Sequence, residues 1–160
     1  MTPAPVLVIG LGNELLQDEG VGIAALRLLQ ERGVSDDIEL LDGGTLGLSL
    51  VPLIEGRTSL VLLDAVRDDT REPGSVLVLE GDEVPRARRL SLSVHEVGVV
   101  DMLGAAELAG CAPANVALVG AVPGALDVGI GLSPALEAAA AAMVDRTLEI
   151  LERWGAIVHA

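Results

Sequence analysis

Four ionisable side chains of this sequence follow apolar, strand-like runs of residues. They are Glu19, Asp42, Asp64 and His95. In α/β folds the carboxyl ends of parallel strands meet at one edge of the sheet, so groups far apart in the chain can converge there. A histidine in the first turn of a helix should stay neutral, because a positive charge opposes the helix dipole, and neutral imidazole is the form that binds a metal. Two carboxylates and one neutral imidazole suit a divalent transition metal with open coordination positions.

Two of these residues have a simple structural alternative. Glu19, at the start of a predicted helix, can serve as a partner of the helix dipole. Asp42, before Gly43 and Gly44, can close an Asx turn. Asp64 is harder to explain in this way, because an acid that abuts the apolar run "LVLL" is desolvated unless it is paired.

The glycine turn after the first apolar run lacks the features of a nucleotide-binding loop. A dinucleotide fingerprint requires G-x-G-x-x-G, and although Gly10 and Gly12 match it, position 15 is a leucine. The P-loop pattern also fails, because no Gly-Lys-Ser/Thr occurs. We expect the two glycines to allow a tight turn, and Asn13 to hold the loop through side-chain hydrogen bonds.

Short β-branched runs alternate with amphipathic segments along the chain. Strands are predicted over residues 6–10, 38–44, 59–66, 74–84 and 115–122. Helices are predicted over residues 18–33, 46–56, 93–110 and 133–154. This alternation predicts an α/β fold of three layers, in which a mostly parallel sheet of about five strands carries helices on both faces. The short link before the fourth strand predicts one antiparallel edge.

Capping residues set the predicted helix boundaries. Asp18 is the expected N-cap of the first helix. Ser93 and Glu96 form a capping box for the third. Ser133 caps the last helix and Pro134 starts it.

The composition predicts a single domain over residues 1–160 and excludes several classes of partner. The chain is 51% hydrophobic with a formal net charge of −14, which argues against nucleic acid and anionic membranes as partners. Trp154 is the only aromatic residue, so no stacking platform for single-stranded nucleic acid is available. The single cysteine, Cys111, excludes an intrachain disulfide and a thiolate zinc cluster. Because neither a signal peptide nor an uninterrupted membrane-length apolar run is evident, we expect a cytoplasmic protein, and by default a monomer.

Five segments of the sequence, in this order, resemble the hydrogenase maturation endopeptidases. They are "GLGNELLQDEGVG", "LDGGTLGLSL", "LVLLDAV", "SVHEVGVVDML" and "LVGAVPGALDVGIGLSP". The resemblance covers about residues 5–150. It implies a twisted sheet between helices, and an endopeptidase that removes a C-terminal extension from the large-subunit precursor of a nickel–iron hydrogenase.

The resemblance also implies roles for individual residues. The family's nickel-recognition ligands fall on Glu19, Asp64 and His95. Its loop for substrate recognition or cleavage falls on Asp42, Gly43, Gly44 and Thr45. The two glycines would let that loop swing when substrate docks, although a static turn explains them equally simply. The chain departs from the family's usual Pro-Glu at Pro123-Gly124.

The resemblance further implies that nickel arrives with the substrate, bound to the precursor's own cysteine thiolates. Either this metal polarises the scissile carbonyl and activates water, or a carboxylate acts as general base on that water. The candidate catalytic carboxylates are Glu19, Asp42 and Asp64. One alternative is a nickel-binding accessory protein for hydrogenase assembly that uses the same ligands without cleaving. A nucleotide-binding regulator is a third hypothesis, which depends only on Gly10 and Gly12.

Overall fold

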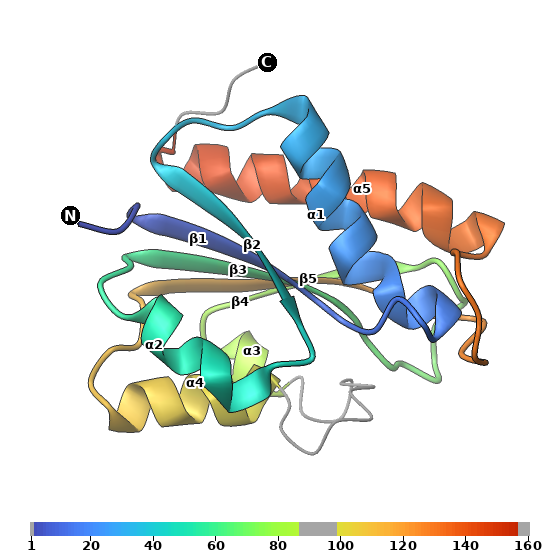
Figure 1. The fold of residues 1–160 in the computed structure, drawn as a ribbon, viewed down its shortest axis with the longest axis horizontal. Helices are drawn as coiled ribbons and strands as arrows, with labels where there is room; N and C mark the ends of the chain where they lie inside the picture. Colours follow the sequence, from blue (N-terminus) through green and yellow to red (C-terminus); the bar gives the residue numbers. More distant parts are fainter. Residues whose placement is uncertain (1, 87–98, 157–160) are drawn as a thin grey trace.

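Five strands form one sheet in the order β2-β1-β3-β5-β4 (Figure 1). The computed structural model describes residues 2–86 and 99–156. The strands are β1 (Val6–Leu11), β2 (Ile38–Gly44), β3 (Ser59–Ala65), β4 (Val76–Glu80) and β5 (Asn115–Ala121). The first three and β5 run parallel, whereas β4 pairs with β5 in the antiparallel direction. The predicted α/β sheet with one antiparallel edge is therefore confirmed.

Helices cover both faces of this sheet (Figure 1). On one face lie α1 (Val21–Arg32) and α5 (Pro134–Arg153), which pack against each other as well as on the sheet. On the other face lie α2 (Val51–Ile54), α3 (Glu83–Arg86) and α4 (Val99–Leu108). Two short 3-10 turns, η1 (Gln17–Gly20) and η2 (Gly47–Leu50), lead into α1 and α2. No described helix is both long and apolar enough to cross a membrane.

The strand β1 shows why the sheet requires both layers. Its side chains alternate between the faces, as in every β-strand. Val6 and Val8 belong to the core under α1 and α5, whereas Leu7 and Ile9 belong to the core under α2 and α4. All four are buried. A strand that is apolar on both faces is stable only when both faces are removed from water, and the predicted buried parallel strand is confirmed.

Two of the predicted boundaries are wrong, at the end of the fourth strand and at the start of the first helix. The fourth strand ends at Glu80 rather than Val84, because residues 83–86 turn into α3. Asp18 is not the N-cap of α1, since the intervening η1 turn moves the cap to Gly20. Ser133 does occupy the N-cap position of α5, but its side chain makes no capping bond there and bonds to Asp18 instead. The predicted capping box at residues 93–96 lies outside the described residues.

Candidate active site

The candidate site lies at the carboxyl edge of the sheet, where β1 and β3 end side by side. The chain continues from β1 to β2 on one side of β1, and then crosses to β3 on its other side. This reversal of direction is a topological switch point, the place where α/β sheets open a crevice for ligands. Glu19 lies in η1, shortly after β1, and Asp64 is the penultimate residue of β3.

Glu19 and Asp64 form a pair of buried acids. Their exposed fractions are 3% and 7%. Burial is the main cause that raises the pKa of Asp64 to about 7. The Ala65 backbone N–H, which donates to Asp64 Oδ1 at 2.8 Å, acts in the opposite direction, and the negative charge of Glu19 raises the pKa further. The structure therefore brings together two of the three predicted metal ligands.

Two glycines allow the backbone around this pair to pack closely. Gly12 has a φ of +133°, and a Cβ atom there would lie 2.0 Å from the carbonyl oxygen of Glu19. At Gly22, in the first turn of α1, a Cβ atom would lie 2.2 Å from the carbonyl oxygen of Leu63. Any larger residue would push η1 and α1 away from the ends of β1 and β3. Gly12, one of the two glycines that match the dinucleotide fingerprint, thus serves the close approach of the backbone to Glu19.

Asp18 anchors the η1 turn to a distant loop. Its side chain is fully buried and accepts hydrogen bonds from the backbone N–H groups of Gly124, Ala125 and Ser133 and from the Ser133 hydroxyl, at 2.7–2.9 Å. Burial alone would raise the pKa of Asp18, but these hydrogen bonds hold it below its ordinary value. This role could not be predicted from the sequence, because no local pattern connects residue 18 with residues 124–133.

Gln17, next to Asp18, holds an unfavourable backbone conformation. Its φ of +50° is the only positive value among the described residues other than glycine. Such a conformation costs on the order of 1 kcal/mol and persists only when neighbouring contacts enforce it. Here the Gln17 N–H donates to the Gly129 carbonyl and the Gly129 N–H donates to the Leu15 carbonyl. The turn that carries Glu19 is therefore held by the loop over residues 122–133.

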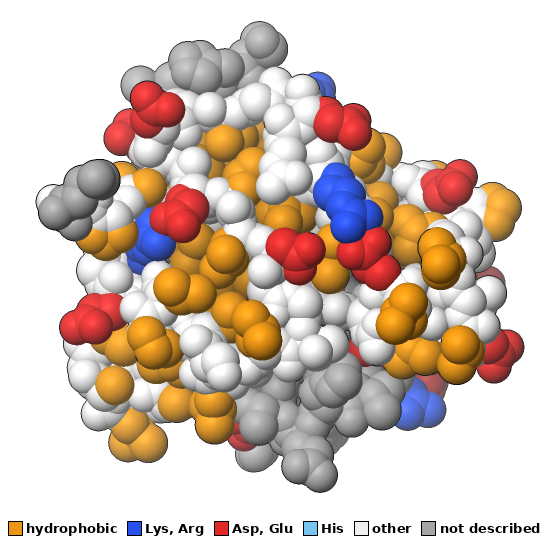
Figure 2. Space-filling view, viewed as in Figure 1, with side chains coloured by type: hydrophobic (Ala, Val, Ile, Leu, Met, Phe, Trp, Pro, Cys, Tyr) orange, Lys and Arg blue, Asp and Glu red, His pale blue; other side chains and the backbone are white. Residues whose placement is uncertain are grey.

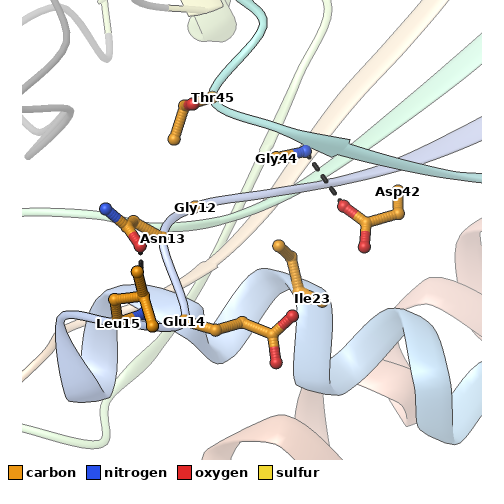
Figure 3. Close-up of a pocket in the computed structure, with 8 residues that line it drawn as sticks. All are labelled: Gly12, Asn13, Glu14, Leu15, Ile23, Asp42, Gly44 and Thr45. Atoms are coloured by element: carbon orange, nitrogen blue, oxygen red, sulfur yellow. Dashed lines mark hydrogen bonds between the residues drawn. The ribbon is translucent and has the colours of Figure 1, made fainter. Parts of the chain in front are cut away.

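A pocket of about 380 Å³ adjoins this turn (Figure 3). It is lined by Gly12, Asn13, Glu14, Leu15, Ile23, Asp42, Gly44 and Thr45. The carboxylates of Glu14 and Asp42 reach it from the β1–η1 loop and from β2 (Figure 3). Glu14 is engaged by Arg27 in a two-point ion pair at 2.6 and 2.7 Å. The predicted Asn13 turn is confirmed, since Asn13 Oδ1 accepts from the Leu15 N–H at 3.0 Å.

The segment from Asp42 to Thr45 borders this pocket, and it lies apart from the Glu19–Asp64 pair. Asp42 lies on β2 and Asp64 on β3, with β1 between them, so about 10 Å separates the two backbones. Asp42 Oδ1 accepts from the Gly44 N–H at 3.0 Å, as in the Asx-turn alternative. A Cβ at Gly43 would lie 2.6 Å from Ile9 Cγ2, and Gly44 has a φ of +48°, so a static turn accounts for both glycines. Their role toward substrate stays a prediction.

The third predicted ligand, His95, lies outside the described residues. Within residues 2–86 and 99–156, no three histidine, cysteine or acidic side chains are grouped closely enough to hold a metal ion. The described part of the site therefore contributes two carboxylates.

Comparison with known proteins identifies the family. A family model described as hydrogenase maturation protease (HycI) matches residues 23–150. The hydrogenase 2 maturation protease of Escherichia coli is 35% identical over 94% of this chain and 92% of its own length. The chain belongs to the hydrogenase maturation protease family. The hydrogenase maturating endopeptidase HybD of E. coli matches the fold with a TM-score of 0.88 over 96% of this chain and 97% of its own. A second relative, the hydrogenase expression/formation protein HupD of Bradyrhizobium diazoefficiens, is 38% identical over 96% of this chain and 81% of its own.

These matches confirm the predicted family, fold and enzyme class. The chain is an endopeptidase of hydrogenase maturation. This result favours the peptidase over the accessory-protein and nucleotide-regulator alternatives. The assignment of individual residues to metal, substrate or catalysis is not tested by these matches.

Proposed function

We propose that this maturation protease removes the C-terminal extension from the nickel-loaded large-subunit precursor of a nickel–iron hydrogenase, in the cytoplasm and as a monomer. The observation that carries the proposal is the pair Glu19 and Asp64, two buried acids close enough for the charge of Glu19 to raise the pKa of Asp64, at the switch point of a sheet with this family's fold. Two buried carboxylates repel each other, and a cation brought between them would relieve that repulsion.

Nickel belongs to the substrate in this proposal. Glu19 and Asp64 would face it, together with His95 as the expected third contact. Oxygen and imidazole donors without a cysteine make a weak, open site, which suits a metal already held by another protein's thiolates. When bound, nickel supplies a positive centre that orients the scissile segment and polarises its carbonyl group.

Hydrolysis also requires a group that takes a proton from the attacking water. We assign this step to a carboxylate of the site, Glu19, Asp64 or Asp42, so that cleavage is of the aspartyl type if an aspartate acts. The water oxygen bonds to the carbonyl carbon, the carbon–nitrogen bond breaks, and the proton passes to the leaving amine. Asp42, Gly43, Gly44 and Thr45 would border the peptide as the substrate loop, next to the pocket in Figure 3.

The proposal is tested by mass analysis of the precursor's C-terminus after incubation with the purified protease. We expect a single cut in the nickel-loaded precursor and none in the nickel-free precursor. We also expect His95→Ala to reduce cleavage strongly, because it removes the third contact. Equal cleavage of loaded and nickel-free precursor, or undiminished cleavage by both His95→Ala and Asp64→Asn, would contradict the proposed roles.

A further inference from the structure

Four exposed apolar side chains form a surface beside the candidate site, which we name the apolar ridge. They are Leu15, Leu126, Val128 and Ile130, with exposed fractions of 61%, 38%, 88% and 88%. Figure 2 shows hydrophobic side chains gathered on the right of the molecule, where the β1–η1 loop and the loop over residues 122–133 lie. Contiguous apolar side chains that are left in water mark binding surfaces more often than single ones do.

The backbone beneath the apolar ridge is rigidly held. The Gly129 N–H donates to the Leu15 carbonyl, and the Gln17 N–H donates to the Gly129 carbonyl. The buried carboxylate of Asp18 fixes the same loop at both ends, through Gly124 and Ser133. The ridge is therefore preorganised, which lowers the entropy lost when a partner binds.

The shape of the apolar ridge favours a folded partner over an extended peptide. A bound peptide needs a concave groove or a strand edge with free backbone groups. Val128 and Ile130 instead project almost fully into solvent, and the N–H and carbonyl of Gly129 between them are both used inside the protein. The ridge thus presents strongly exposed side chains, which can enter a hollow of a folded protein.

The apolar ridge is continuous with the candidate site. Leu15 belongs to the ridge and also lines the pocket that contains Asp42. Asp18, which holds the loop of the ridge, directly precedes Glu19. If a partner protein places a peptide at Glu19 and Asp64, the part of its surface next to that peptide would therefore contact the apolar ridge.

We infer that the apolar ridge docks the folded body of the hydrogenase large-subunit precursor, beside the segment that is cut. This inference rests on the proposed function. Docking of the folded body would bring the scissile bond to the site independently of the contacts that the peptide itself makes. The protease would then recognise its substrate by shape at the ridge.

The test is the affinity of the intact protease for immobilised precursor. The variant is Val128→Glu with Ile130→Glu, and a milder variant is Val128→Thr with Ile130→Thr. The control is Leu53→Glu with Leu108→Glu, which adds the same charge to exposed leucines on α2 and α4. We expect at least tenfold weaker binding for the glutamate variant, a smaller loss in the same direction for the threonine variant, and less than twofold change for the control. A precursor truncated at the cleavage site should lose affinity by the same factor.

Four results would overturn the inference. They are unchanged affinity of both ridge variants, an equal loss in the control, a loss confined to the untruncated precursor, and a change in self-association with unchanged precursor binding. If the wild-type protease binds the precursor without cutting it, the proposed function fails, while the affinities still decide the inference. If the wild-type protease does not bind the precursor, the inference falls as well.

Discussion

At the scale of single residues, neighbouring acids of this site differ because their surroundings differ. Asp18 and Asp64 are both buried, yet the pKa of Asp18 lies below its ordinary value and that of Asp64 is raised to about 7. Among the described residues, Asp18 accepts four hydrogen bonds, whereas Asp64 accepts one from Ala65 and lies in the field of Glu19. Asp18 is therefore suited to remain charged and hold a loop, whereas the anion of Asp64 is less favourable, and a nearby cation would stabilise it.

The raised pKa of Asp64 predicts the pH dependence of stability in the metal-free protein. An acid whose folded-state pKa lies above its unfolded value costs stability as pH rises from the unfolded value, near 4, to about 7. In the presence of a chelator, Asp64→Asn should remove this loss, which amounts to about 4 kcal/mol at pH 8 for a pKa raised from near 4 to about 7. Denaturant unfolding at pH 5 and pH 8 measures the difference. Parallel pH profiles for the two proteins would contradict this electrostatic account.

The hydrogen bonds of Asp18 predict a large loss of stability for Asp18→Asn. The amide presents a donor to groups that themselves donate, so the N–H groups of Gly124, Ala125 or Ser133 that face this buried side chain lose their acceptor. We expect a loss of about 2–4 kcal/mol, measured by denaturant unfolding. The matched control is Asp68→Asn, whose carboxylate accepts from Thr70 in an exposed turn and should cost below about 1 kcal/mol. Equal, small losses in both variants would show that the hydrogen bonds of Asp18 contribute little to the free energy of unfolding.

At the scale of elements, apolar runs predicted the central strands well and the loops poorly. The runs at residues 38–44 and 59–66 became β2 and β3 almost to the residue. The central strand β3 is buried along its whole length, as a strand covered on both faces must be, whereas the edge strand β2 is only partly buried. The η1 turn was not predicted, since its shape depends on Asp18 bonding to residues more than a hundred positions away. Local patterns record local contacts, and this turn is held by distant ones.

The candidate site was predictable in part for the same reason. Asp64 was recognised because an acid at the end of an apolar strand is unexpected there. Its proximity to Glu19 followed from the rule that parallel strands end at one edge. The apolar ridge had no such signal, because the sequence of residues 126–130 does not reveal that Val128 and Ile130 are exposed. Only the packing of the loop on η1 shows that.

The close packing of α1 on the sheet predicts opposite effects for two helical glycines. A Cβ at Gly22 would lie 2.2 Å from the Leu63 carbonyl oxygen and 2.5 Å from that of Leu11, so Gly22→Ala must displace α1 and should destabilise the fold by about 1–3 kcal/mol. A Cβ at Gly104, in α4, meets no described atom within 4 Å, so Gly104→Ala should stabilise by up to about 1 kcal/mol. Thermal unfolding of both variants measures the contrast. A neutral Gly22→Ala would refute the packing argument.

At the scale of the whole molecule, the excess of negative charge lowers the stability of the folded state. The chain carries 24 acidic residues against 10 basic ones. Such an excess makes the compact state repel itself, and salt screens that repulsion. The midpoint of thermal unfolding should therefore rise when sodium chloride increases from about 0.02 M to about 0.2 M, where the Debye length falls below about 10 Å. A midpoint that falls over this range would mean that favourable ion pairs, such as Arg27 with Glu14, outweigh the repulsion.

The central claim is that cleavage occurs at the Glu19–Asp64 pair, and the rate of precursor cleavage tests it most directly. The measurement is kcat/KM on nickel-loaded precursor for Glu19→Gln and for Asp64→Asn, with Glu149→Gln on the exposed side of α5 as the control. We predict losses of at least about 100-fold for the first two and less than twofold change for the control. A value of kcat/KM within threefold of the wild type for either site variant would contradict the account.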